Sequence, residues 1–253
     1  MPTALSRYVL HLESAGHAPT TVRTYRCVIS RWERSELEIV EYLANLNHGT
    51  VTASTRAYYG IVLKEYFRWQ ERCGLLSLSP LEGVRFRRPP AVPVRPFSQV
   101  EIDALLAACR CPVERGVILC LLRLGLRASE LAGIEADDVG TDVVIIRKAK
   151  GGKERVLAVG PLLGPLEAIC GAGLRYQAVY RMVKGVGRRA GVAGCHPHRM
   201  RHTFADAYLR AGGDRGDLRV LLGHSSYVMV DRYCAFFESE RAVAAHQRFL
   251  EAG

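Results

Sequence analysis

The sequence contains no long hydrophobic run. The longest uninterrupted apolar stretches, such as Val117 to Leu122, have six residues, whereas a helix that crosses a bilayer needs ~20. The residues before Pro19 also lack the apolar core of roughly 7 to 15 residues that marks a secretion signal. These absences argue against a membrane protein and predict a cytoplasmic one with no membrane contact.

Cysteine pairs at the usual metal-binding spacing are also missing. The sequence has no Cys-x-x-Cys motif, and most of its cysteines fall inside apolar helical patterns, as Cys120 does. In a protein that is not secreted, this pattern predicts reduced thiols in the core. The eight cysteines are at positions 27, 73, 109, 111, 120, 170, 195 and 234.

Positive charge is in excess. The 253 residues include 35 Lys and Arg against 25 Asp and Glu, a net charge of +10. Before Phe97 there are 13 basic against 8 acidic residues, so both halves of the chain are basic. Such an excess favours a polyanionic partner, because basic residues displace the counterions of a phosphate backbone. The length of the chain allows one large domain or two small ones, and 49% hydrophobic residues are enough for packed cores.

The first part of the sequence reads as helical. Apolar residues at helical spacing predict four helices in the first ~80 residues, and Gly74 stops the fourth. Residues 80–96 then carry five of the eleven prolines, which predicts an extended linker. We therefore expect a helical domain over residues 1–88, a linker over 89–96 and a second domain over 97–253.

The second part combines helices with one hairpin. Ser98 and Glu101 have the spacing of a capping box, and an apolar helix from about Arg115 ends at Gly125. The β-branched runs 143–146 and 156–159 flank a Lys-Ala-Lys-Gly-Gly-Lys turn. Further helices are expected at about 161–170, 176–190, 198–211 and 214–222, with a short one after Ser226. The predicted fold class is mainly α, with a small antiparallel β-hairpin in the second domain.

Several residues that can carry chemistry lie in this second part. Arg127 follows the helix stop in an apolar setting, where its charge needs a partner such as Glu130. His198 and Arg201, three residues apart on one helix, share a face. Lys150 lies on the hairpin turn, His224 follows Leu-Leu-Gly, and Tyr233 comes nine residues later. A zinc site remains an alternative, with candidate ligands Cys195, His198, His202 and His224, although Arg201 beside them would repel a cation.

The order and spacing of these residues closely resemble the tyrosine recombinase (phage integrase) family. The match comprises Arg127, Lys150 in Lys-Gly-Gly-Lys-Glu-Arg, His198-x-x-Arg201-His202, Leu-Leu-Gly-His224 and Tyr233. The stretch from Gly16 to Tyr25 is similar to the helical core-binding domain of that family. The resemblance implies a short form with core-binding and catalytic domains only, which together clamp duplex DNA. It further implies a homotetramer on DNA, and a reaction that needs neither metal nor cofactor.

The resemblance also assigns roles. Tyr233 would attack the scissile phosphate and form a 3′-phosphotyrosyl link, with Tyr227 as a rival nucleophile. Arg127 and Arg201 would hold the non-bridging oxygens, because forked guanidiniums fit them better than point charges. Lys150 would be the general acid, His198 would assist proton transfer and His224 would hydrogen-bond the phosphate. Glu130 would orient the arginine site, and the linker residues Arg85, Arg87, Arg88 and Arg95 are DNA-binding candidates.

The expected function is therefore site-specific DNA recombination by an integrase that exchanges strands through a Holliday junction. Two alternatives stay open: a Xer-like resolvase of chromosome or plasmid dimers, and an inactive DNA-binding relative. Apolar residues after Tyr233 predict a final helix that needs a surface to pack on, in the same protomer or in a neighbour. They are Phe236, Phe237, Val243, Ala244, Phe249 and Leu250.

Overall fold

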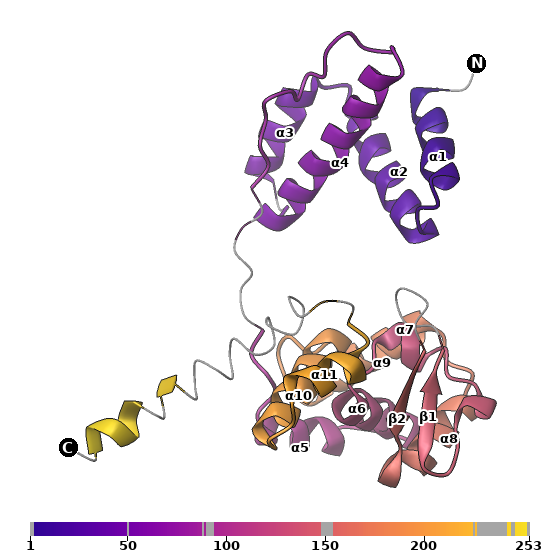
Figure 1. Cartoon of the computed structure of the whole chain (residues 1–253), viewed down its shortest axis with the longest axis vertical. Helices are drawn as coiled ribbons and strands as arrows, with labels where there is room; N and C mark the ends of the chain where they lie inside the picture. The colour runs from indigo at the N-terminus through magenta and orange to yellow at the C-terminus, as the bar shows by residue number, and fades with distance from the viewer. Residues whose placement is uncertain are drawn as a thin grey trace. The chain divides into compact units, whose positions relative to one another are not determined.

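The chain divides into two compact units, Met1–Ala91 and Val92–Gly253 (Figure 1). The computed structural model describes residues 3–49, 51–87, 89, 94–147, 154–224, 226, 242–243 and 246–251. Of the proline-rich segment, residues 84–87, 89 and 94–96 form neither helix nor strand. Among the described residues, no helix has the length and apolar character needed to cross a membrane.

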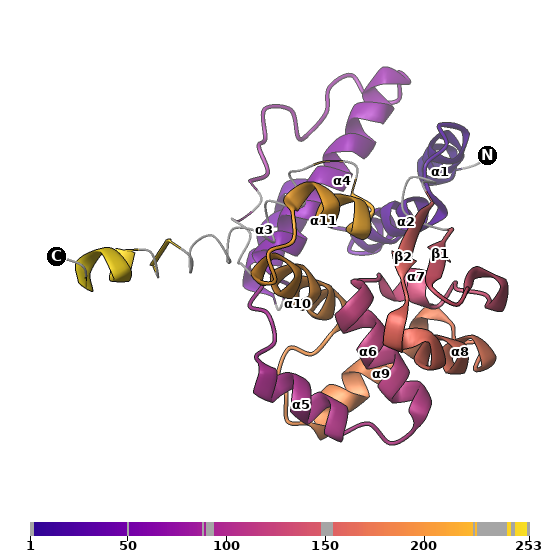
Figure 2. The same ribbon diagram turned by 60° about the horizontal axis from the view of Figure 1, so that its bottom comes forward.

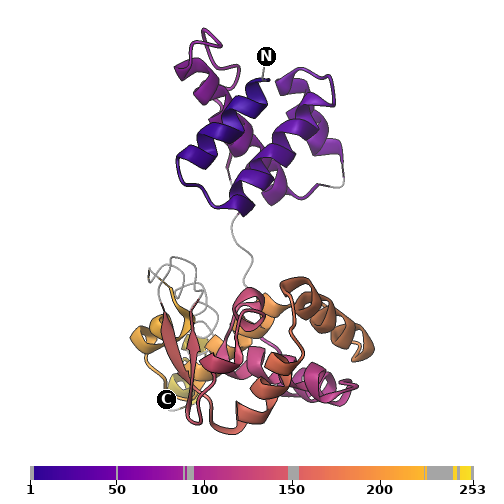
Figure 3. The same ribbon diagram turned by 90° about the vertical axis from the view of Figure 1, so that its right-hand side faces the viewer.

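In the part of the first unit that the structure describes there are four helices, as predicted (Figure 3). Thr3 and Thr52 begin α1 and α4 by accepting a backbone N–H with their side chains, and Pro19 opens α2 at its first position. The core is rich in aromatic rings, with the Tyr8 ring 5.1 Å from that of Tyr66 and 5.0 Å from that of Trp69. The helices are α1 (Ala4–Ser14), α2 (Pro19–Glu33), α3 (Ile39–His48) and α4 (Ala53–Arg72).

The second unit is also mainly helical, with one two-stranded antiparallel sheet, which confirms the predicted fold class. In the sheet, β1 (Val143–Ile146) pairs with β2 (Arg155–Ala158), so that Ile146 lies opposite Arg155; β2 thus begins one residue earlier than predicted. Single 3₁₀ turns occur at Ala136–Asp138 and Gly160–Leu162. The helices are α5 (Gln99–Ala107), α6 (Pro112–Leu124), α7 (Ala128–Leu131), α8 (Leu163–Gly171), α9 (Tyr176–Arg189), α10 (Pro197–Arg210) and α11 (Arg215–Leu222).

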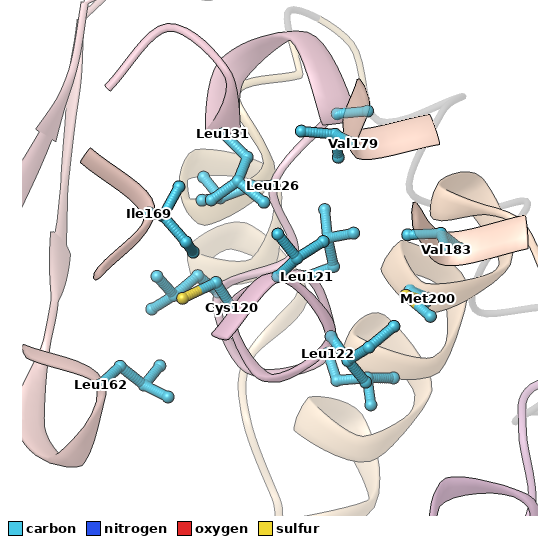
Figure 4. Close-up of a cluster of buried hydrophobic side chains, with 14 of the residues drawn as sticks. Cys120, Leu121, Leu122, Leu126, Leu131, Leu162, Ile169, Val179, Val183 and Met200 are labelled. Atoms are coloured by element: carbon cyan, nitrogen blue, oxygen red, sulfur yellow. The ribbon is translucent and has the colours of Figure 1, made fainter. Parts of the chain in front are cut away.

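Helix α6 is the central element of the second unit (Figure 2). It packs against α8, α9 and α10, and its Cys120 and Leu121 side chains are fully buried. The surrounding elements contribute Ile169, Val183 and Met200 to the same cluster (Figure 4). Because several helices enclose α6, its C-terminal end at Leu124 is fixed in position. The position of the residues that follow Leu124 is thereby fixed as well.

The capping box predicted at Ser98 and Glu101 is present: the Ser98 hydroxyl accepts the Glu101 N–H, and the Glu101 carboxylate accepts the Ser98 N–H. Arg199 of α10 ties this region down. Its guanidinium donates to the Arg95 carbonyl at 2.9 Å and to Glu101 at 3.0 Å, and lies 3.9 Å from the centre of the Phe97 ring. The start of the second unit is therefore fastened to the helix that carries His198 and Arg201.

The prediction of core thiols is wrong for three cysteines: Cys27, Cys73 and Cys111 are exposed. Cys120 and Cys195 are buried, and Cys109 and Cys170 are partly buried against the same core. Two of the exposed residues lie at helix ends rather than on an apolar face: Cys73 caps the C-terminus of α4, and the Cys111 sulfur accepts the Glu114 N–H at the start of α6. All seven cysteines in the described part of the chain are free thiols, and Cys234 lies outside it.

The tail residues that the structure describes, 242–243 and 246–251, are helical. Val243, Phe249 and Leu250 are 56%, 74% and 64% exposed. The short helix predicted after Ser226, together with Phe236, Phe237 and Ala244, falls outside the described residues.

Replacement of Gly125 by alanine tests the junction after α6. Gly125 has a left-handed φ of 60°, and an added Cβ would lie 2.3 Å from Phe204 Cδ1. We expect Gly125→Ala to lower the free energy of unfolding by ~1–2 kcal/mol for the backbone plus ~1–3 kcal/mol for overpacking. Gly173→Ala is the matched control, since Gly173 has a φ of 55° and no atom within 4 Å of the added Cβ.

The measurement is urea unfolding followed by circular dichroism. Tryptophan fluorescence reports the first unit, where Trp32 and Trp69 both lie, and is expected to be unchanged. Equal losses for Gly125→Ala and Gly173→Ala would show that the contact with Phe204 costs nothing.

Candidate active site

Three of the predicted site residues line one pocket of the second unit. Arg127, His198 and Arg201 surround a hollow of about 520 Å³ together with Tyr176 and Tyr180. The first three come from the starts of α7 and α10, and the two tyrosines from the first turns of α9. Three helices, α7, α9 and α10, begin around this pocket. The fold thereby brings together Arg127 and Arg201, which are 74 residues apart in the sequence.

Arg127 is held by its local sequence. Gly125 ends α6 in a left-handed conformation, the buried Leu126 follows, and Arg127 becomes the N-terminal cap of α7. Glu130, at the third position of that helix, accepts the Arg127 backbone N–H at 2.8 Å and its Nη1 at 2.6 Å. The predicted pairing of Glu130 with Arg127 is thus present, and it leaves the Arg127 side chain 28% exposed.

Three arginines converge on the carboxylate of Glu130, which is 3% exposed. Besides Arg127, Arg155 at the start of β2 donates from Nη1 to Oε1 at 3.2 Å and from Nη2 to Oε2 at 2.8 Å. Arg201 Nη1 lies 3.6 Å from Oε2. Burial alone raises the pKa of Glu130, but the hydrogen bonds from Arg155 and Arg127 outweigh it and hold this pKa below its ordinary value. Glu130 is therefore ionised at neutral pH.

Arg201 is 1% exposed and lies between the C-terminal ends of two helices. Its Nη1 donates to the carbonyl of Gly125, which caps α6, at 2.7 Å, and its Nη2 donates to the carbonyl of Leu222, the last residue of α11, at 2.5 Å. Helix C-termini leave carbonyls without helical partners and carry partial negative charge. Both helix ends consequently stabilise the buried guanidinium and fix its direction.

His224 follows the C-terminal cap of α11 and contacts Arg201. Its Nε2 lies 2.9 Å from Arg201 Nη2, and because a guanidinium only donates, Nε2 is the acceptor and the ring proton is on Nδ1. Burial, followed by the positive charges of Arg201, Arg127 and Arg155, lowers the pKa of His224 to about 4. The imidazole is thus neutral at physiological pH.

His198 is exposed on the pocket wall, with its ring edge-on to that of His202 at a centroid distance of 4.7 Å. Partial burial of the ring and the charge of Arg201 lower the pKa of His198. Burial and the neighbouring histidines lower that of His202 to about 3. A neutral His198 beside two arginines can accept a proton, which is what a general base must do.

The remaining predicted residues fall into two groups. Arg85, Arg87 and Arg95 are exposed. Four other residues lie outside the described part of the chain: Arg88, Lys150, Tyr233 and the rival nucleophile Tyr227.

Two of the four candidate zinc ligands have other partners. The Cys195 thiol donates to the Val183 carbonyl, and His224 contacts Arg201. Across the described ranges, no group of three His, Cys, Asp or Glu side chains gathers in a way that could hold a metal ion.

Sequence reasoning missed Arg155, Tyr176 and Tyr180. For Arg155 a signal existed, since strand periodicity places it on the same face as Leu157 and Val159, and all three are buried. An arginine in step with buried apolar positions indicates a paired buried charge. For the two tyrosines the sequence carried no comparable signal.

The chain is similar to known proteins in sequence and in fold. Residues 170–240, which include His198, Arg201, His224 and Tyr233, match the model of the "Phage integrase family". The tyrosine recombinase XerD of Ralstonia nicotianae is 29% identical over 224 residues, covering 76% of this chain and 72% of that protein. These matches support the tyrosine recombinase family.

Solved structures of this family share the fold. A lambda integrase dimer bound to a core site superposes with a TM-score of 0.75 at 18% identity, covering 91% of this chain and 93% of that one. A lambda integrase tetramer bound to a Holliday junction gives a TM-score of 0.70 at 18% identity, covering 88% and 76%. At this level of identity the similarity concerns the fold.

The lowered histidine pKa values predict an acid-sensitive fold. In the unfolded chain His224 and His202 bind a proton near pH 6.5, whereas in the folded protein they do so near pH 4 and 3. Between these values the unfolded state binds more protons, so the free energy of unfolding falls as the pH falls, by up to ~1.4 kcal/mol per pH unit for each histidine. We expect the thermal midpoint to fall from pH 6.5 to pH 4.

His224→Asn should flatten this pH dependence, and the exposed His246→Asn should leave it unchanged. A midpoint that is constant or rises over this pH range would contradict the assignment of neutral, buried histidines.

Proposed function

We propose that this tyrosine recombinase breaks and rejoins DNA strands at specific sites, with a phosphodiester bound between Arg127 and Arg201. The observation that carries the proposal is an excess of positive charge among the side chains that the structure describes. Three guanidiniums gather around one carboxylate, and His224 beside them is neutral. Buried or half-buried charge of one sign requires a counter-charge, and a DNA phosphate supplies one.

The chemistry follows from the roles that the resemblance to this family gives to these residues. The Tyr233 hydroxyl oxygen attacks the phosphorus, the bond from phosphorus to the 5′ oxygen breaks, and a 3′-phosphotyrosyl link forms. His198, neutral at physiological pH, takes the tyrosine proton, and Lys150 gives a proton to the departing 5′ oxygen. Arg127 and Arg201 face the non-bridging oxygens, where negative charge grows in the transition state, and His224 hydrogen-bonds the phosphate. Attack by a 5′ hydroxyl on the same phosphorus reverses these steps and reseals the strand.

The substrate follows from the same family membership. Residues 1–88 act as the core-binding domain and residues 97–253 as the catalytic domain, while the exposed Arg85, Arg87 and Arg95, together with Arg88, contact the phosphate backbone. Four copies exchange strands between two sites through a Holliday junction. The fold shared with a lambda integrase tetramer on such a junction supports this assembly.

A nicked duplex that contains the recombination site tests the nucleophile. After cleavage the short fragment next to the nick diffuses away, so the covalent intermediate accumulates as a slow band on a denaturing gel. We expect this band with the wild type in a chelating buffer and with Tyr227→Phe, and none with Tyr233→Phe. A band that persists in Tyr233→Phe would overturn the assignment, and a wild type that binds the site without a band would favour the inactive relative.

Substitution of Arg201 separates catalysis from binding. Arg201→Lys keeps the charge but loses the forked geometry that spans the Gly125 and Leu222 carbonyls. We expect the cleavage rate at saturating protein to fall by about 100-fold or more, in the range seen when a transition-state donor is removed, while the Kd for DNA changes little. Arg123→Lys, on the exposed face of α6, is the control and should cleave normally. A parallel loss of binding and cleavage would show that Arg201 is mainly a binding contact.

A further inference from the structure

Arg155 is the one member of the three-arginine cluster to which the proposed chemistry gives no task. We infer that Arg155 is a positioning residue: by neutralising Glu130, it allows that carboxylate to orient Arg127 and Arg201 without cancelling their charge. This inference rests on the proposed phosphate site and adds the device that keeps the site positive.

The distances show how the Glu130 carboxylate is shared. Arg155 binds it through both terminal nitrogens, at 3.2 and 2.8 Å, in the side-by-side manner that makes Arg–carboxylate pairs strong. Arg127 makes one side-chain bond to Oε1, and Arg201 stays 3.6 Å from Oε2. The side chains of Arg155 and Glu130 are 5% and 1% exposed, so their charges are screened little by solvent. The single negative charge is therefore matched mainly by Arg155.

The last turn of α11 keeps two like charges apart. Arg155 Nε donates to the carbonyl of Leu221 at 2.7 Å, and Arg201 Nη2 donates to the next carbonyl, that of Leu222. Adjacent carbonyls of one helix end thus hold two guanidiniums, with Glu130 between them. Without this arrangement their repulsion would push one of them away.

The backbone of Gly223 makes room for Arg155. Gly223 has a φ of 63°, and an added Cβ would lie 2.9 Å from Arg155 Nη1 and 3.4 Å from its Cζ. Strand β2 supplies the direction, because its alternation turns Arg155 inward and Val156 outward. Three separate elements, β2, α7 and α11, are therefore shaped around this one side chain.

A second arginine, next to the same sheet, shows what a purely structural pair looks like. Arg147, directly after β1, forms an ion pair with Asp138, whose side chain is 4% exposed. Arg147 itself is 52% exposed, and neither residue lines the pocket that contains Arg127 and Arg201. Arg147→Met therefore removes an arginine from a buried carboxylate just as Arg155→Met does, but away from the site.

The test uses the full-length protein and the nicked site under single-turnover conditions. For Arg155→Met we expect a cleavage rate at saturating protein at least about tenfold lower, ~1.4 kcal/mol in the barrier, with the Kd for DNA within about threefold of wild type. The rate falls because, without Arg155, the negative charge of Glu130 is neutralised by Arg127 and Arg201, which leaves less positive charge for the phosphate. Arg155→Lys should be intermediate, and Arg147→Met should match the wild type. Thermal unfolding of each variant identifies any loss of folding.

Two further readouts respond to charge rather than to structure. With a methylphosphonate at the scissile position, which lacks the phosphate charge, the rate ratio of wild type to Arg155→Met should shrink toward one. The double variant Glu130→Gln/Arg155→Met should cleave faster than Arg155→Met, since the carboxylate that competes for the arginines is gone. It also keeps the test decisive if Arg155→Met unfolds, because it leaves no unpaired buried charge.

Failure of the inference can be told apart from failure of the proposed function. If the wild type forms no covalent product, the proposed function fails. If the wild type cleaves and Arg155→Met cleaves at the same rate, or if the ratio is the same on the methylphosphonate, Arg155 does not position the arginine pair. A double variant no faster than Arg155→Met would likewise overturn the inference.

Discussion

An ionised carboxylate that is almost completely removed from water must be surrounded by donors and positive charge, and in this protein that condition applies to Glu130. Its two oxygens bind the backbone and side chain of Arg127 and the paired nitrogens of Arg155, with Arg201 next to them. The carboxylate thus joins α7, β2 and α10. The placement of the site depends on this group, since each arginine takes its direction partly from Glu130.

Helix ends provide the second layer of support. The ends of α6 and α11 each offer a carbonyl to Arg201, and each helix terminates in a left-handed glycine, Gly125 or Gly223. At both glycines a Cβ would collide with a neighbouring side chain. Gly125 and Gly223 therefore end the two helices, leave space for the neighbouring side chains and direct the carbonyls toward Arg201. In this way a small, mostly helical unit holds several positive charges in one place.

The sequence predicts the elements well because their signals are local. The capping residues Ser98 and Glu101, the stop at Gly125 and the proline that opens α10 all act within one helical turn. The pairing of Arg127 with Glu130 is local too. The contacts of Arg155 with Glu130 and Leu221 span 25 and 66 residues, so no local pattern encodes them. Cysteine burial was misjudged for a related reason: Cys73 and Cys111 lie at helix termini, where apolar periodicity does not determine burial.

The central claim is that a DNA phosphate binds between Arg127 and Arg201 while Glu130 stays paired with Arg155. A crystal structure with a nicked site and orthovanadate tests it, because five-coordinate vanadium mimics the transition state of phosphoryl transfer. We predict vanadium bonded to the Tyr233 hydroxyl oxygen, with both arginines donating to its equatorial oxygens and the bond between Glu130 and Arg155 retained. Vanadate bound elsewhere, or arginines that remain turned to Glu130 and away from it, would contradict the account.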